Sequence, residues 1–173
     1  MESNKSFNAS QKEAKHTQNK RFKKVEEKIK EEKTMSEFTI LKRLQRVENF
    51  IGSFPCDAIP ECTNFPSLFI LNTDKSNSKG SHWFAIREDK TTIEVYDSLK
   101  LKKYPPEIEK YFSKKRTIRI RKLQPDKSYF CGLFSCYFII SRSCSSFKTV
   151  LKPFSRTLSQ NDSIILQQLY SLW

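Results

Sequence analysis

The stretch GSHWFAIREDKTTIEVYD, residues 80–97, contains two runs in which apolar and polar residues alternate. Alternation with a period of two is typical of strands that bury one face, so the two runs predict an antiparallel hairpin with a tight turn. The register that matches apolar partners pairs Ile86 with Ile93, and it also places His82 opposite Asp97 at the open end of the hairpin. Opposed side chains in such a pair have Cβ atoms about 4.5–5.5 Å apart. We therefore expect the Asp97 carboxylate to lie within reach of the His82 imidazole.

His82 has two interpretations. A histidine at the head of an apolar strand is more often a structural residue, and this is the better interpretation of His82 taken alone. A neighbouring carboxylate, however, fixes the tautomer of an imidazole and stabilises its protonated form, which prepares a histidine to move protons. The predicted pairing with Asp97 gives the two interpretations equal weight. The other histidine of the chain, His16, lies in a lysine-rich segment.

A histidine of this kind needs a nucleophile, and Cys131 is the candidate. It opens the apolar stretch CGLFSCYFIIS, residues 131–141, which is too long for a typical strand and predicts a buried helix. A helix N-terminus stabilises a thiolate, whereas on composition alone Cys131 would be a buried thiol. Cys136 and Cys144 fall inside this stretch or just after it, and we interpret both as buried small hydrophobes.

Gln124 is the candidate for a further catalytic role. It follows a predicted strand and precedes the loop that delivers Cys131. A side-chain amide at this place can join the backbone N–H of Cys131 in stabilising an oxyanion. Taken by itself, a single glutamine in a loop is nearly always a surface residue.

The composition limits the setting of the protein. A chain of 173 residues with a net charge of +13 suits one domain with an appendage and predicts an acidic partner, of which nucleic acid is the commonest. The five cysteines include no CxxC pair, which makes zinc a poor alternative to free thiols. The chain starts without the apolar stretch of a signal peptide, and no apolar run is long enough to span a bilayer. We therefore expect reduced thiols, no membrane association, and an intracellular location in the nucleus or cytoplasm.

The sequence divides into a tail and one domain. Residues 1–34 are basic and almost free of apolar side chains, a composition typical of disordered segments. Residues 35–173 predict a mixed α+β domain. Its expected elements are a helix capped by Ser36 with apolar positions Phe38, Leu41, Leu44 and Val47, a loop over 49–60, a strand over 67–72, the hairpin, a helix from Pro105 and Pro106 through Phe112, a strand over 117–123, the helix that begins at Cys131, and a last helix over 161–172 capped by Asn161 or Asp162.

Taken in order along the chain, these residues resemble the adenovirus-type cysteine endopeptidase (adenain) family, including its relatives encoded by virus-like transposons. The shared order is His-Trp, an acid at a strand end, a glutamine and Cys-Gly. The resemblance covers nearly the whole domain and rests on five motifs: SEFTILKRL, NFIGSF, FILNTDKSNSKGSHWFAI, EVYDSL and CGLFSCYF. The six residues between Gln124 and Cys131 also look like adenain, because the related SUMO-deconjugating proteases usually have five there.

The resemblance implies an α+β, papain-like cysteine protease fold of the adenain type, with a central mixed or antiparallel sheet packed by helices and the nucleophile at a helix N-terminus. It implies Cys131 as the nucleophile, His82 as the general base and Asp97 as the residue that orients the histidine. Gln124 corresponds to the oxyanion donor, and Trp83 to the residue that packs beside the histidine. The implied substrates are structural precursors of a virus or transposon, cut at sites with small residues or glycine, by an enzyme that is in some cases packaged in the virion.

The chain also departs from the family. Asp97 stands where adenain has glutamate, and Lys100 stands where the family commonly has glycine. Adenain is activated by DNA and by a viral peptide that forms a disulfide with the enzyme, but the matching segment here, KKRTIRIRK, has no cysteine. A disulfide-linked peptide activator is therefore unsupported and any peptide activator is unknown, whereas the charge is compatible with DNA. Arg119 and Arg121 alternate with isoleucines, so a strand would present both on one exposed face that can follow a phosphate backbone.

We therefore expect a cysteine endopeptidase that acts on a protein substrate and uses no metal or organic cofactor. Two alternatives stay open. The first is a deconjugase for a ubiquitin-like protein, of the SUMO-protease type, which shares the chemistry but takes a folded substrate. The second is a basic nucleic-acid-binding protein that carries a catalytically silent protease fold. For the basic segment itself, the alternative is a solvated surface without a partner.

Overall fold

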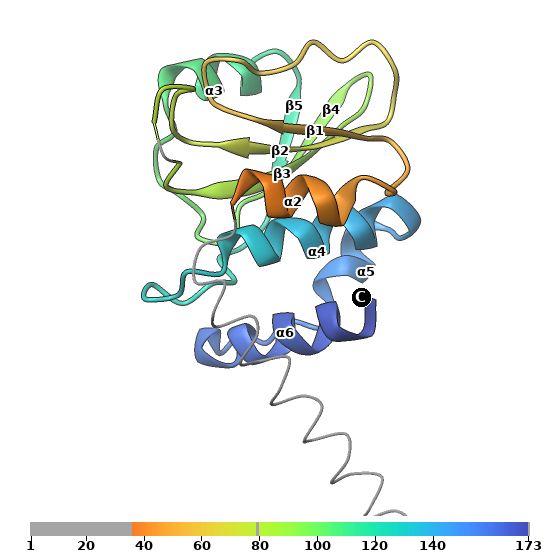
Figure 1. The fold of residues 1–173 in the computed structure, drawn as a ribbon, viewed down its shortest axis with the longest axis vertical. Coiled ribbons are helices and arrows are strands. Elements are labelled where there is room, and N and C mark those ends of the chain that lie inside the picture. Colours follow the sequence, from red (N-terminus) through yellow and green to blue (C-terminus); the bar gives the residue numbers. More distant parts are fainter. Residues whose placement is uncertain (1–35, 79, 173) are drawn as a thin grey trace, which may run out of the picture.

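The computed structural model describes residues 36–78 and 80–172 (Figure 1). The predicted tail over residues 1–34 lies outside the described residues. The described chain forms one five-stranded sheet with helices packed against it, so the expected α+β class is confirmed. Within this part of the chain, no helix is both long and apolar enough to cross a membrane.

The sheet is mixed, as expected, and its spatial order follows the chain. The two outer pairs of strands are parallel and the two inner pairs are antiparallel. The strands are β1 (Phe50–Phe54), β2 (Ser67–Asn72), β3 (Trp83–Glu88), β4 (Thr92–Tyr96) and β5 (Arg116–Arg119).

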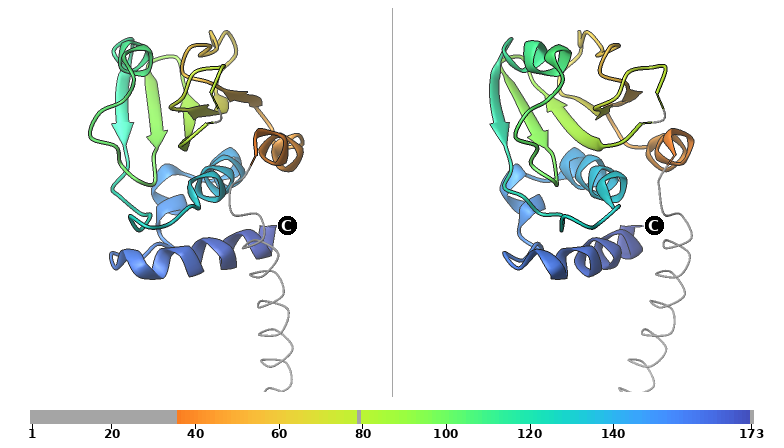
Figure 2. Two further views of the ribbon diagram at one scale, coloured as in Figure 1. Left: turned by 60° about the vertical axis from the view of Figure 1, so that its left-hand side comes forward. Right: turned by 90° about the vertical axis from the view of Figure 1, so that its left-hand side faces the viewer.

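Helices lie on both sides of the sheet (Figure 2). One side carries α3 (Pro106–Phe112), and the other carries α4 (Cys131–Cys144), with α2 (Glu37–Leu44), α5 (Phe147–Leu151) and α6 (Asn161–Leu172) packed around α4. Strand β2 separates the two cores, since Leu68 and Ile70 belong to the cluster around α4 while Phe69 and Leu71 belong to the cluster around α3. All six residues of β2 are buried, which explains why its sequence is apolar without alternation.

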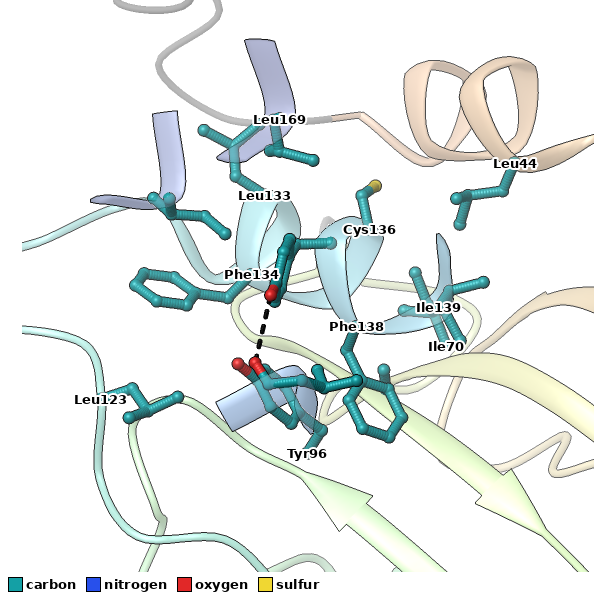
Figure 3. Packing of buried hydrophobic residues seen from close by; sticks show 14 of the residues in the cluster. Leu44, Ile70, Tyr96, Leu123, Leu133, Phe134, Cys136, Phe138, Ile139 and Leu169 are labelled. Atoms are coloured by element: carbon teal, nitrogen blue, oxygen red, sulfur yellow. Dashed lines mark hydrogen bonds between the residues drawn. The ribbon is translucent and has the colours of Figure 1, made fainter. Parts of the chain in front are cut away.

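Helix α4 runs through the larger core and confirms the predicted buried helix. All eight residues from Gly132 to Ile139 are buried, because neighbouring elements surround this part of the helix (Figure 3). Phe138 stacks on Tyr96 of β4 with ring centroids 4.4 Å apart. Near the other end of the helix, the Nε and Nη2 atoms of Arg142 donate to the Glu94 carboxylate at 2.8 and 2.9 Å. Both contacts hold α4 against β4, and so fix the position of Cys131.

The hairpin of β3 and β4 forms, but its register differs from the expected one. Ile86 pairs with Val95 rather than with Ile93, because the Asp89 N–H bonds to the Thr92 carbonyl and moves the turn along the chain. This change is a slip of two residues. Since side chains alternate with a period of two, the slip leaves every side chain on its expected face.

Two expectations for the first elements are wrong. The segment predicted as a loop contains β1, whose parallel ladder with β2 outweighs the loop signals of Gly52 and Pro55. Ser36 caps α2 as predicted, by accepting a hydrogen bond from the Thr39 N–H. Of the predicted apolar positions, Leu44 is buried together with Ile40, whereas Phe38 is 74% exposed and Leu41 is also exposed. A spacing of three drifts around a helix of 3.6 residues per turn, so it marks the buried face only in part.

Candidate active site

Three segments bring the predicted site residues to one end of the sheet. His82 immediately precedes β3, Asp97 immediately follows β4, and Cys131 is the first residue of α4. Because β3 and β4 are antiparallel, the start of one strand lies beside the end of the other. A cleft of about 810 Å³ opens at this place, and its lining includes His82, Cys131, Gln124 and Trp83.

The imidazole of His82 and the carboxylate of Asp97 are in contact. The Nε2 atom of His82 lies 2.8 Å from Oδ1 of Asp97, and the two residues are only 6% and 3% exposed. The observed register places them as diagonal neighbours rather than opposite each other, a separation that long side chains still bridge. The contact expected from the sequence is therefore present, although the pairing that led to the expectation is shifted.

Asp97 is held in its charged form by four hydrogen bonds. Its Oδ1 atom also accepts from the Leu99 N–H at 3.0 Å, and its Oδ2 atom accepts from the Leu101 N–H at 2.8 Å and the Tyr104 hydroxyl at 2.6 Å. Burial alone would raise the pKa of this carboxyl group, but the hydrogen bonds, led by that from His82, outweigh burial and lower the pKa.

His82 is poised to carry a positive charge. Burial lowers the pKa of the imidazole, but its contacts with Asp97 and Cys131 outweigh burial and raise the pKa to about 9. The Nε2 atom is engaged by Asp97, so the contact with the thiol falls to Nδ1. Nδ1 is buried and has no hydrogen-bond partner among the described residues. The imidazole thus lies between a carboxylate and a thiol.

Cys131 occupies the place expected of a nucleophile. It is partly exposed, it lines the cleft, and it begins a helix of 14 residues. The N-cap residue, Phe130, makes no side-chain capping hydrogen bond. The backbone N–H groups in the first turn of a helix, together with the helix dipole, favour a negative charge at this position.

Gln124 is buried rather than exposed, at 1% of its surface, and it lines the same cleft. Its Oε1 atom accepts from the Ser98 hydroxyl at 2.7 Å, and its Nε2 atom donates to the Ser128 carbonyl at 2.7 Å. A side-chain amide nitrogen carries two hydrogens, so a second donor remains. Ser98 directly follows Asp97, and one turn of chain therefore positions both the carboxylate and the amide.

The turn after Asp97 contains Lys100, the residue that departs from the family pattern. The Lys100 N–H donates to the Asp97 carbonyl at 3.1 Å, and Lys100 has a φ of 55°. This left-handed conformation favours glycine, but Lys100 adopts it here, and the turn expected to be in doubt is formed.

Sequence reasoning missed the residues that support the site. Tyr104 and Ser98 hold Asp97 and Gln124, and no local pattern marks either of them. Asn161 or Asp162 was expected to cap the last helix, but both lie inside α6, and the Nδ2 atom of Asn161 donates to the Leu123 carbonyl at 2.8 Å. That bond fixes the chain immediately before Gln124. These partners come from 7 to 38 positions away, which is beyond the reach of short motifs.

The remaining cysteines differ from one another. Cys136 is fully buried, as expected, and burial raises the pKa of its thiol to about 12, which excludes it as a thiolate at neutral pH. Cys144 is exposed, so the expectation that it is buried is wrong, because it lies at the last position of α4 beyond the buried turns. In the described part of the chain, no three His, Cys, Asp or Glu side chains gather as a metal site requires.

Arg119 and Arg121, the residues of the expected basic strip, are both exposed, and each also makes a contact inside the domain. Strand β5 ends at Arg119, whose guanidinium lies 5.0 Å from the ring centroid of Phe112 and 3.6 Å from the Glu109 carboxylate. Arg121 donates to the carbonyl of Phe154 at 2.9 Å. The strand predicted over 117–123 is therefore shorter than expected, but both arginines stay exposed, and their binding to a phosphate backbone stays a prediction.

The comparisons with known proteins find matches among solved structures. No protein-family model matches the chain, and a search of curated proteins finds no match. The ASFV pS273R protease matches 78% of this chain and 65% of its own, less than two thirds, at 17% sequence identity and a TM-score of 0.49. The SUMO protease Ulp1 matches 78% of this chain and 75% of its own, at 16% identity and a TM-score of 0.40.

Proposed function

We propose that this chain is a cysteine endopeptidase of the adenain type, with Cys131 as nucleophile and His82 as general base. The observation that carries the proposal is the state of the His82 ring. Its Nε2 atom meets a buried carboxylate, while its Nδ1 atom is buried without a hydrogen-bond partner among the described residues, beside the thiol. A purely structural histidine would have both nitrogens satisfied.

The geometry supports a two-step reaction. The Cys131 thiolate attacks the carbonyl carbon of the scissile peptide bond, and the oxyanion that forms accepts hydrogen bonds from the Gln124 Nε2 donor and the Cys131 backbone N–H. The intermediate collapses to a thioester as His82 gives its proton to the leaving amine. His82 then removes a proton from water, which attacks the thioester and releases the acid and the thiolate. Asp97 holds the ring in position and stabilises its charge in both steps.

We propose that the cleft takes an extended peptide with small side chains near the reacting bond, as the resemblance to adenain implies. Its lining includes Gly80, Ser81 and the half-buried Trp83. We propose structural precursors of a virus or transposon as substrates, processed inside the host cell or in the virion. DNA as an activator remains a proposal supported by the net charge of +13 and by the exposed Arg119 and Arg121.

Labelling with an electrophilic glycine-ended peptide, with the modified residue located by mass spectrometry, tests the proposal. We expect a single adduct, on Cys131, and none when Cys131→Ala is treated in the same way. An unlabelled Cys131 would favour the alternative of a silent protease fold. Labelling by a glycine-ended ubiquitin-like protein but not by the short peptide would favour a deconjugase.

A further inference from the structure

A buried amide beside the cleft has no role in the reaction described above. Asn72, the last residue of β2, is 3% exposed and belongs to the lining of the cleft. Its Oδ1 atom accepts from the Asp74 N–H at 2.8 Å, whereas its Nδ2 atom has no hydrogen-bond partner in the described part of the chain. Leaving a buried donor unpaired costs free energy, so such a group beside a cleft indicates a donor kept for a ligand.

Gly80 lies directly against Nδ2, where no larger residue would fit. Gly80 has a φ of +81°, and a Cβ atom at this position would lie 2.5 Å from Nδ2 of Asn72 and 3.4 Å from the ring of Trp83. Asn72 and Trp83 are also partners in the ladder between β2 and β3. The Thr73 N–H donates to the His82 carbonyl at 3.0 Å. The donor therefore lies on the wall of the cleft that also carries the histidine.

The charges around the Nδ2 atom of Asn72 indicate which kind of acceptor group it can bind. Two carboxylates, those of Glu37 and Asp74, line the same cleft, and the nearby Lys75 ammonium is paired with Glu107 at 3.4 Å. This arrangement disfavours an anionic ligand. A backbone carbonyl oxygen is a neutral acceptor, and an extended peptide presents one at every residue.

We propose that Asn72 is a substrate-positioning residue whose Nδ2 atom donates a hydrogen bond to a backbone carbonyl oxygen of the bound peptide. This inference rests on the proposed endopeptidase function and adds a main-chain contact to it. Gly80 lies against Nδ2, so the hydrogen bond to the substrate forms as Gly80 moves aside. The contact orients the peptide without reading its sequence, because it involves no substrate side chain.

Two substitutions of Asn72 remove the donor of its amide and keep an acceptor oxygen. Asn72→Asp and Asn72→Ser both keep an oxygen for the Asp74 N–H and remove the Nδ2 donor, and only the first adds a charge. Asn77→Asp is the matched control, since Asn77 is exposed in the same connection and undergoes the same change of charge. Each protein is treated with the electrophilic glycine-ended peptide over a range of concentrations, and its thermal unfolding midpoint is measured.

For both Asn72 variants, we expect the half-saturating peptide concentration to rise about five- to tenfold, the value of one net hydrogen bond, while the maximal labelling rate stays within about twofold. The control stays within about twofold in both quantities. Unchanged half-saturation in both variants would overturn this inference and leave the endopeptidase intact. A lower maximal rate, or loss of folding in both variants, would also overturn it, since Asn72 would then serve the chemistry or the fold. Wild-type protein that is not labelled would overturn the proposed function and this inference together.

Discussion

The two ends of the β3–β4 hairpin each bury a carboxylate, and they use it differently. At the turn end, Glu88 accepts from the Lys115 ammonium at 2.5 Å and from the Tyr111 hydroxyl at 2.6 Å, and neither oxygen is left unpaired. At the open end, Asp97 is equally well satisfied, but its partner His82 keeps one buried ring nitrogen without a hydrogen-bond partner among the described residues. The first network is complete within the domain. The second leaves one ring nitrogen of His82 without a partner, and in the proposed reaction that nitrogen serves the thiol.

The largest effect is expected at the nucleophile. Cys131→Ala removes the only group that His82 can activate, so peptide turnover falls to the background level. Cys136→Ala, five residues further along the same helix, leaves a small cavity and costs about 1–3 kcal/mol of unfolding free energy without loss of turnover per folded molecule. Peptide hydrolysis and urea denaturation of both variants check this. Wild-type turnover in Cys131→Ala would refute the proposed mechanism.

The two carboxylates can be compared directly by isosteric substitution. Asp97→Asn removes the charge that supports the imidazolium, and we expect kcat to fall about 10³–10⁴-fold with the fold retained. Glu88→Gln weakens the pairing with Lys115 and should lower the free energy of unfolding by about 1–3 kcal/mol, with kcat within about twofold. Kinetics and denaturant unfolding on the same samples distinguish the two. Equal losses of kcat in Asp97→Asn and Glu88→Gln would show that the two carboxylates do not differ in their role.

A somewhat smaller effect is expected at the oxyanion donor. Gln124→Ala should lower kcat by about 10²–10³-fold with little change in KM, because the donor acts on charge that develops in the transition state. The variant also leaves the Ser98 hydroxyl without its acceptor, so unfolding is measured in parallel to confirm that the protein is folded. A rise in KM alone would show that Gln124 binds the substrate and the transition state equally.

The sequence was sufficient for the features that depend on periodicity. The buried helix that begins at Cys131 follows from its apolar length. The contact of His82 with Asp97 was predicted correctly although the predicted register was wrong, since a slip of two residues preserves the face on which a side chain lies. Strand β1 was missed because parallel pairing with β2 is a tertiary interaction that Gly52 and Pro55 conceal.

Features that depend on distant partners could not be predicted. Tyr104 reaches the Asp97 carboxylate from the segment before α3, and Asn161 reaches the Leu123 carbonyl from 38 positions away. The face of α2 was misjudged because Ile40 is buried by its place against α4, whereas Phe38 has the same apolar character and is exposed. In each case the arrangement of elements decides which of several similar residues is used.

The protonation state of His82 connects the Asp97 network with the proposed chemistry. Its pKa in the folded protein, about 9, is raised above the ordinary value of 6.5. The stabilisation that the protonated ring contributes is therefore complete below about pH 6.5 and is lost as the pH rises through 9. Removing the thiol in Cys131→Ala should lower the pKa of His82, because one of the contacts that raises it is lost.

Titration of the histidine ring signals by NMR tests the central claim most directly. His16→Gln assigns the two histidines, and His16 in the wild-type chain provides a comparison within the same sample. We predict that the His82 signals titrate near pH 9, and that the midpoint moves down in Cys131→Ala. A His82 midpoint below pH 7 that is unchanged in Cys131→Ala would contradict the account, because the ring would then be a neutral structural histidine without coupling to the thiol.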